Sequence, residues 1–255
     1  MLPWRMFDAV TIVAIFGTFL LAGTVKGVIG LGLPTVSLAL LTVAIDLPSA
    51  MALLLVPSFV TNLWQAAVGG NGKAIMLRIW PFLLMATLTV WLGATALTRV
   101  DLSFLSALLG TLLVAYSILN LAGLHVKITT RQEVWVGPLF GTANGILTGM
   151  TGSFVVPGVM FLQSIGLPRD MLIQAMGMLF TASTLALAVA LKGNNFLTAQ
   201  LGTLSAASLL PATIGMVFGQ RIRQSLSERL FRHVFFSALL MLGAYIIANA
   251  FFDLR

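Results

Sequence analysis

Two long apolar stretches, residues 9–45 and 134–168, contain most of the residues that could bind a ligand. The residues that break them are Gly23, Gly27, Gly30, Gly32 and Pro34, and then Gly141, Gly145, Gly149, Gly152, Pro157 and Gly158. A helix that begins at such a break leaves up to four backbone N–H groups unpaired and carries about half a positive charge at that end. Two facing helix ends of this kind, with Pro34 and Pro157 in their first turns, would bind an anion.

Lys26 is the one charged residue in these two stretches. At the centre of a membrane a lysine costs roughly 2.5–3.5 kcal/mol on insertion scales, so such a residue usually faces protein or water. There it would add a positive charge to the anion site, with Asn144 as its counterpart in the second stretch. Alternatively, Lys26 lies near a helix end and extends to the lipid headgroups. The sequence leaves both roles open.

The candidate substrate-binding residues combine this charge with adaptable backbone, hydroxyl groups and amides. They are Lys26, Gly30, Gly32, Thr35, Asn62, Trp64, Gln65, Asn144, Gly149, Thr151, Gly152, Ser153 and Gln174. Glycine lets the backbone approach a ligand closely, and the Trp64 indole could close the pocket around a short carbon chain. Each candidate also has a structural alternative, because glycines and polar residues pack membrane helices together and tryptophan often lies at the membrane interface.

The sequence argues against several other kinds of site. It has no Cys and two His, which removes disulfides, thiolate metal sites and a histidine cluster. It contains no H-E-x-x-H, G-x-S-x-G or Walker motif and no acid pair inside an apolar segment. We therefore expect no enzyme, no cofactor and no bound metal. The lack of buried acids also argues against a cation pump, so anions are the favoured ligands.

The elements that would position these residues are membrane helices. Of the 255 residues, 59% are hydrophobic and 8% are charged, against about 25% charged in soluble domains. Apolar runs of about 20 residues indicate an all-α polytopic membrane protein rather than a barrel of ~10-residue strands. The net charge of +7 comes from Lys and Arg in short loops, so it indicates topology and not a nucleic acid partner.

The two broken stretches resemble one another. Gly23-Thr24-Val25-Lys26-Gly27 matches Gly141-Thr142-Ala143-Asn144-Gly145, and Leu47-Pro48 matches Leu167-Pro168. We therefore expect two repeats of about five segments each, with broken or short helices near the centre. The N-terminal repeat, 1–123, has predicted segments at about 9–28, 33–45, 48–69, 75–97 and 103–122. A basic loop at 124–133 precedes the C-terminal repeat, 134–255, with segments at about 134–149, 155–166, 169–191, 198–220 and 230–251.

Basic loops indicate how these segments are oriented. Basic residues gather near Lys73, Lys127 and Arg221, in loops separated by even numbers of segments, so these loops share the cytoplasmic side. Equivalent loops of the two repeats then face opposite sides, which is typical of inverted-topology repeats with a binding site between the broken segments. Ten crossing segments place both termini on the non-cytoplasmic side. A short segment that re-enters without crossing would change this count.

The stretch from Gly23 to Pro34, its partner from Gly141 to Pro157 and the two Leu-Pro steps resemble the TauE/SafE family of sulfite and organosulfonate exporters. The resemblance implies a multi-pass carrier of the bacterial inner membrane that moves sulfite, sulfoacetate or related C2 sulfonates outward by alternating access. It leaves open whether transport is coupled to protons. From the residues alone, a passive anion channel and a membrane-embedded enzyme or scaffold remain as alternatives. The expected partners are the small anion and the lipid bilayer, and the G-x-x-x-G spacings also permit a homodimer.

Overall fold

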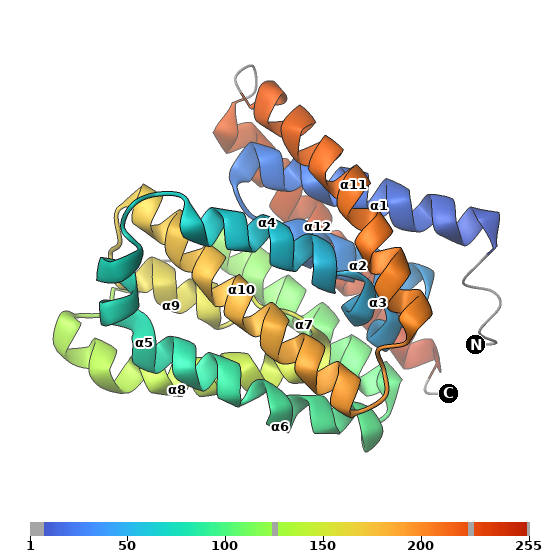
Figure 1. The fold of residues 1–255 in the computed structure, drawn as a ribbon, viewed down its shortest axis with the longest axis horizontal. Coiled ribbons are helices and arrows are strands. Elements are labelled where there is room, and N and C mark those ends of the chain that lie inside the picture. The colour runs from blue at the N-terminus through green and yellow to red at the C-terminus, as the bar shows by residue number, and fades with distance from the viewer. Residues whose placement is uncertain (1–7, 124–126, 224–226, 254–255) are drawn as a thin grey trace.

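The computed structural model of the protein describes residues 8–123, 127–223 and 227–253, and the regular secondary structure in these residues is helical (Figure 1). The first half contains α1 (Ala9–Ile29), α2 (Leu33–Ala44), α3 (Leu47–Leu53), α4 (Leu55–Ala67), α5 (Gly72–Leu88), α6 (Val90–Ala94), the 3-10 turn Thr95–Thr98 and α7 (Leu102–Leu121). The second half contains α8 (Thr130–Thr151), α9 (Gly158–Ser164), α10 (Arg169–Gly193), α11 (Ala199–Ile222) and α12 (Glu228–Asp253). The predicted all-α class is confirmed.

Within the described residues, 6 helices are long and apolar enough to cross a membrane, or up to 7 if α3 and α4 form one span. The short helices α2 and α9 have 12 and 7 residues, or ~18 Å and ~10 Å, which is less than the ~30 Å of hydrocarbon. Each broken stretch therefore contains one long and one short helix. Val10, Trp135 and Phe252 point away from the bundle and are 74%, 81% and 72% exposed, as expected of a surface that faces lipid.

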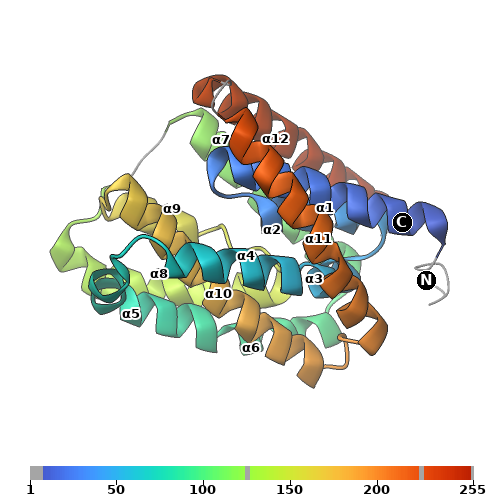
Figure 2. The same cartoon turned by 45° about the horizontal axis from the view of Figure 1, so that its top comes forward.

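Exchanging the two halves of the chain reproduces the same helix pairs. α1 packs along α11, and its counterpart α8 packs along α5 and α6, which together correspond to α11. α4 packs against its counterpart α10, and α7 packs against its counterpart α12. Figures 1 and 2 show α4 and α10 between the α1–α11 pair on one side and α5, α6 and α8 on the other. The molecule is thus built from two similar halves.

Counterpart helices run antiparallel. The end of α4 lies beside the start of α10, where Gln65 Nε2 donates to the Ile173 carbonyl at 2.8 Å. The end of α7 likewise lies beside the start of α12, where the rings of Tyr116 and Phe236 pack edge to face. Halves related by a two-fold axis in the membrane plane have antiparallel counterparts. The repeats are therefore inverted, as the loop charges predicted.

The predicted segment 48–69 is two helices, α3 and α4, with a bend of 45° between them. Pro57 explains the break, because its nitrogen has no hydrogen to donate to the Leu53 carbonyl four residues earlier. Ser205 of α11 supplies the missing bond, since its Oγ donates to that carbonyl at 2.7 Å and accepts from the Val56 N–H at 3.1 Å. Hydrogen bonds to Ser205 therefore hold the bend against α11.

The connection between the repeats and the start of α9 also differ from the prediction. The loop is shorter than 124–133 because α8 begins at Thr130, after a capping box between Thr129 and Gln132. The predicted segment 155–166 is shorter too, since α9 covers only Gly158–Ser164. Pro157 precedes this helix and does not lie in its first turn.

The predicted segment 75–97 is split into α5, α6 and the 3-10 turn. The first break is at Thr89, whose hydroxyl lies 2.7 Å from the Met85 carbonyl and 3.0 Å from the Thr142 carbonyl of α8. A threonine that bonds to the carbonyl four residues earlier often bends a helix. The bend keeps α6 against α8.

Basic residues gather at one end of the bundle, where α5, α8, α10 and α12 begin and α11 ends (Figure 1). This end carries Lys73, Arg78, Lys127, Arg131, Arg169, Arg221, Arg223, Arg229 and Arg232, with Glu133, Asp170 and Glu228 as the acids in the described part of the chain. The other end carries Asp8, Asp46, Asp101 and Asp253 beside Arg99 and Lys192. Charge is therefore distributed asymmetrically along the helix direction.

Candidate anion-binding site

The glycines of the two stretches mainly pack helices together. A Cβ on Gly23 or Gly27 would overlap carbonyl oxygens of α11. A Cβ on Gly141, Gly145 or Gly149 would overlap atoms of α5 and α6 in the same way. Gly149, a candidate site residue, therefore serves the contact between α8 and α6. These glycines are also covered within the chain, so they do not offer a surface to a second copy.

The turn between α1 and α2 depends on two glycines. Gly30 ends α1 with a φ of 80°, and Gly32 precedes α2 with a φ of 110°, both in the left-handed region that favours glycine. Pro34 follows in the first turn of α2, as predicted. Thr35 is 4% exposed and belongs to the packed start of α2. Of these residues, Gly30 lines the cleft described below, whereas Gly32 and Thr35 are not among its lining residues.

Lys26 lies one turn before the end of α1 and points into the bundle. It is 5% exposed, and its Nζ donates to Thr61 Oγ1 at 3.2 Å and to Asn62 Oδ1, both on α4. Lys26 therefore does not extend to the headgroups. Both of its partners are neutral, and the ion pair found among the described residues joins Arg78 to Glu133. The ammonium is thus buried without a carboxylate partner in the part of the chain that the structure describes.

A cleft of about 610 Å³ lies between α1, α4, α10 and α11. Its lining residues are Lys26, Gly27, Gly30, Thr61, Trp64, Gln65, Val68, Ile173, Met216, Gln220 and Arg223. Lys26 and Thr61 are buried and form the floor, whereas Gln220 and Arg223 are exposed near the end of α11. The cleft therefore runs from the ammonium towards the basic end of the bundle.

The cleft brings together some of the candidate residues. Lys26, Gly30, Trp64 and Gln65 line it, and Asn62 lies directly behind Lys26 as its hydrogen-bond partner. Asn62 is fully buried, and its Nδ2 has no partner among the described residues. Trp64 is 69% exposed, so its indole lies at the rim of the cleft.

Met216, Gln220 and Arg223 line the cleft but were not predicted from the sequence as binding residues. These residues come from the end of α11, which packs beside α1 although nearly 200 residues separate them in the chain. The one signal in the sequence was the basic loop that contains Arg223, and such a loop indicates membrane topology as readily as a binding site.

Asn144 occupies the position in α8 that Lys26 occupies in α1, but its partner is different. Its Oδ1 accepts from the Gly158 N–H at 2.9 Å, at the start of α9. Asparagine has an acceptor for this bond, whereas lysine has none. The chain itself therefore occupies the helix end at which the sequence predicted an anion.

Thr151, Gly152 and Ser153 lie at the end of α8 and are not among the lining residues of the cleft. Thr151 Oγ1 donates to the Leu147 carbonyl at 2.7 Å and accepts from the Ser153 N–H at 3.2 Å. Gly152 ends α8 with a φ of 74°, and a Cβ there would approach the Met51 side chain to 2.6 Å. These residues shape the turn after α8.

Gln65 and Gln174 link α4 to α10. Gln65 Nε2 donates to the Ile173 carbonyl at 2.8 Å, and Gln174 Nε2 donates to the Ala66 carbonyl at 2.8 Å. Gln174 Oε1 also accepts from the Asn71 N–H at 3.1 Å. Gln174 therefore supports the wall of the cleft without lining it, whereas Gln65 does both.

Comparison with known proteins identifies a family for this chain. The family model described as "Sulfite exporter TauE/SafE" matches residues 15–246. The curated proteins and the solved structures gave no match to this chain. The matched range begins in α1 and ends in α12, so it includes both repeats and the Lys26 cleft. A match of this extent shows that the chain belongs to the TauE/SafE family of sulfite exporters.

Proposed function

We propose that this protein is a secondary transporter that exports small sulfur-containing anions, such as sulfite, sulfoacetate and related C2 organosulfonates. One observation carries the proposal: the Lys26 ammonium lies at the floor of a cleft with neutral partners only. A buried cation without a counter-charge is unfavourable, so it favours a bound anion over a neutral solute or a cation. The family supports the sulfur-containing class of anion.

Lys26 retains a donor for the substrate. An ammonium has three N–H donors, of which Thr61 and Asn62 accept two. Ionised sulfonate and sulfite groups accept hydrogen bonds, so one of their oxygens can bind the third N–H. Gln220 and Arg223 offer further donors near the end of α11. We therefore place the substrate in this cleft and not between two helix N-termini.

The basic end of the bundle supports a cytoplasmic position for the mouth of the cleft. Cytoplasmic loops of membrane proteins carry an excess of Lys and Arg, and Lys73, Arg131 and Arg223 lie at this end, where α5 and α8 begin and α11 ends. We infer that it faces the cytoplasm of a bacterial inner membrane and that both chain termini lie on the other side. A cleft with this orientation takes up substrate from the cytoplasm, as export requires.

The difference between the two halves supports alternating access. Asn144 and Thr148, which occupy the positions of Lys26 and Gly30 in the second repeat, are both 0% exposed. The cleft around Lys26 is open at the exposed residues Trp64 and Gln220. In carriers with inverted repeats, the two halves exchange conformations when access changes sides. We therefore assign the structure to the state that is open to the basic end.

The lining residues of the cleft include no acidic side chain. Proton-coupled transporters commonly relay protons through buried Asp, Glu or His residues. If export of sulfite is coupled to protons, we propose that the proton is carried by the substrate itself, as the protonated form of sulfite.

Flux measurements on the purified protein in proteoliposomes test this function. We expect saturable transport of sulfite or sulfoacetate with counter-flow, inhibited by related sulfur anions and not by acetate. Flux that rises linearly with concentration and shows no counter-flow would indicate a channel. Chemical change of the substrate would indicate an enzyme, and flux no greater than in protein-free vesicles would contradict the proposal.

A further inference from the structure

A second cavity lies behind the turn that connects α1 to α2. It has a volume of about 310 Å³ and is lined by residues of α7, α9, α10 and α12. Ile29 and Leu31 line this cavity, while Gly30 between them lines the Lys26 cleft. The turn therefore separates the two spaces, and Ile173 of α10 contributes to both walls.

Tyr116 is one of the residues that line this inner cavity, and its hydroxyl is buried without a partner. Tyr116 is 1% exposed, and its Oη has no hydrogen-bond partner among the described residues. Its ring is held edge-on against Phe236, with centroids 5.3 Å apart and planes at 76°. A buried hydroxyl without a partner is unfavourable. A ligand that accepts a hydrogen bond in the cavity would satisfy it.

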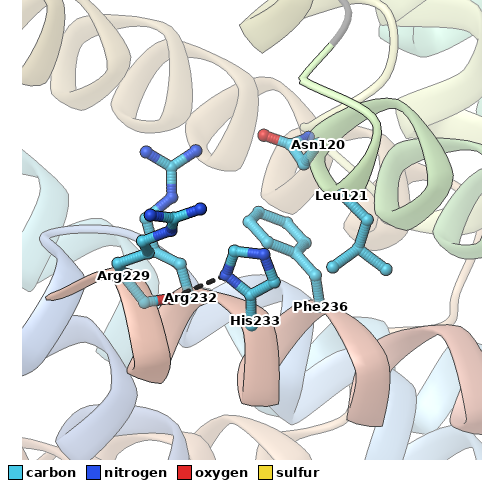
Figure 3. Close-up of a pocket in the computed structure, with 6 residues that line it drawn as sticks. All are labelled: Asn120, Leu121, Arg229, Arg232, His233 and Phe236. Carbon is cyan, nitrogen blue, oxygen red and sulfur yellow. Dashed lines mark hydrogen bonds between the residues drawn. The ribbon is translucent and has the colours of Figure 1, made fainter. Parts of the chain in front are cut away.

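An outer pocket of about 390 Å³ adjoins the inner cavity, because Asn120, Arg232 and Phe236 line both. It is also lined by Arg229 and His233, whose Nδ1 lies 2.8 Å from the Arg229 carbonyl oxygen. Figure 3 shows the guanidinium groups of Arg229 and Arg232 on one side of the pocket, with the Asn120 amide across from them. The two spaces together lead from the surface to Tyr116.

The arginines of this region are suited to bind an anion. Among the side chains that the structure describes, the ion pair found joins Arg78 to Glu133, and no carboxylate pairs with Arg229 or Arg232. Arg169, at the start of α10, also lines the inner cavity. Basic residues that only determine membrane topology would not be expected to line a cavity. Here the arginines line connected cavities, together with Tyr116, whose buried hydroxyl has no partner among the described residues.

We propose that the inner cavity and outer pocket form a binding site for a tetrahedral oxyanion, a phosphate or sulfate group, with Arg232 and Tyr116 as hydrogen-bond donors. Guanidinium groups bind such oxyanions through paired N–H donors. The group can come from a free ion or from an anionic lipid, because basic pockets between membrane helices also bind lipid headgroups. The site is separate from the Lys26 cleft and does not depend on the proposed transport function.

Two measurements on the full chain purified in detergent test the site and identify the source of the group. The first measures the shift of the unfolding temperature with inorganic phosphate at constant ionic strength. The second uses native mass spectrometry to compare adducts of phosphatidylglycerol with those of phosphatidylcholine. The variants are Arg232→Gln, Tyr116→Phe and Lys26→Ala. Arg131→Gln is the matched control, because Arg131 is exposed at the same end but lines neither space.

We expect binding in at least one measurement, and the one that responds identifies a free ion or a lipid as the source. Arg232→Gln should weaken it at least tenfold, because a charged hydrogen bond is lost. Tyr116→Phe should weaken it about threefold or more without lowering the unfolding temperature of the ligand-free protein, since the hydroxyl has no partner to lose. Lys26→Ala and Arg131→Gln should bind like the wild type.

Three results would overturn the proposal. One is the absence of binding in both measurements. Another is an equal loss of affinity in Arg232→Gln and Arg131→Gln, which would mean that only the overall charge matters. The third is loss of binding in Lys26→Ala with retention in Arg232→Gln, because the anion would then occupy the cleft.

Discussion

Replacing Lys26 by methionine removes the buried charge while keeping an unbranched side chain. We expect Lys26→Met to fold and to lose most of its affinity for sulfur-containing anions. Two effects on stability oppose one another. Removing the uncompensated cation is favourable by roughly 2.5–3.5 kcal/mol on insertion scales, whereas Asn62 Oδ1 loses its donor at a cost of about 1–3 kcal/mol. The net change in stability should therefore be small.

The loss of affinity follows from the third N–H of the ammonium. A hydrogen bond to a charged group contributes about 1.5–3 kcal/mol, which corresponds to a change of about ten- to a hundredfold in the dissociation constant. An anion at ~100 times its dissociation constant stabilises the folded protein by about 2.7 kcal/mol. If Lys26→Met weakens binding a hundredfold, the same concentration adds only about 0.4 kcal/mol.

Thermal unfolding with sulfite and sulfoacetate, followed by flux in proteoliposomes, measures this difference. Lys73→Met is the matched control, because it removes a lysine that is exposed at the start of α5, at the same end of the bundle. The control should keep the shift in unfolding temperature and the concentration dependence of flux. If Lys26→Met keeps both as well, the ammonium does not bind the substrate and the reasoning is wrong.

Three further substitutions test the packing that positions the cleft, each by thermal unfolding of the purified protein. Gly23→Ala should destabilise by about 1–3 kcal/mol because its Cβ would overlap the backbone of α11, whereas Gly17→Ala, where a Cβ meets nothing within 4 Å, should not; equal effects would refute the packing role. Ser205→Ala should destabilise by about 1–3 kcal/mol, because the carbonyl at the bend between α3 and α4 loses its donor, and an unchanged unfolding temperature would contradict this. Glu133→Gln should destabilise by about 1–3 kcal/mol, because the amide lacks the charge and can keep only one of the two bonds with Arg78 at 2.6 and 2.9 Å, and the effect should not vanish in high salt because the Glu133 side chain is only 9% exposed.

Features that depend on local composition and spacing were predictable from the chain alone. Apolar runs between charges predicted a helical membrane protein, because hydrocarbon excludes charges and requires paired backbone groups. The break after α1 was predictable because glycine, as at Gly30, allows a positive φ, and proline, as at Pro34, fixes φ and has no N–H to donate. The repeated motif and the alternating loop charges predicted the inverted halves. Lys26 was identifiable as a candidate because it is the lone charge in an apolar stretch.

Which polar groups meet was decided only by the tertiary structure. Lys26 bonds to Thr61 and Asn62 because α1 is rotated so that it faces α4, and no local pattern specifies that rotation. Asn144, its counterpart, instead caps α9, because an amide can accept a hydrogen bond and an ammonium cannot. Arg223 joins the cleft because glycines let α11 approach α1 closely. Composition and spacing therefore determined the helices and their breaks, whereas close packing of segments distant in the chain determined the binding site.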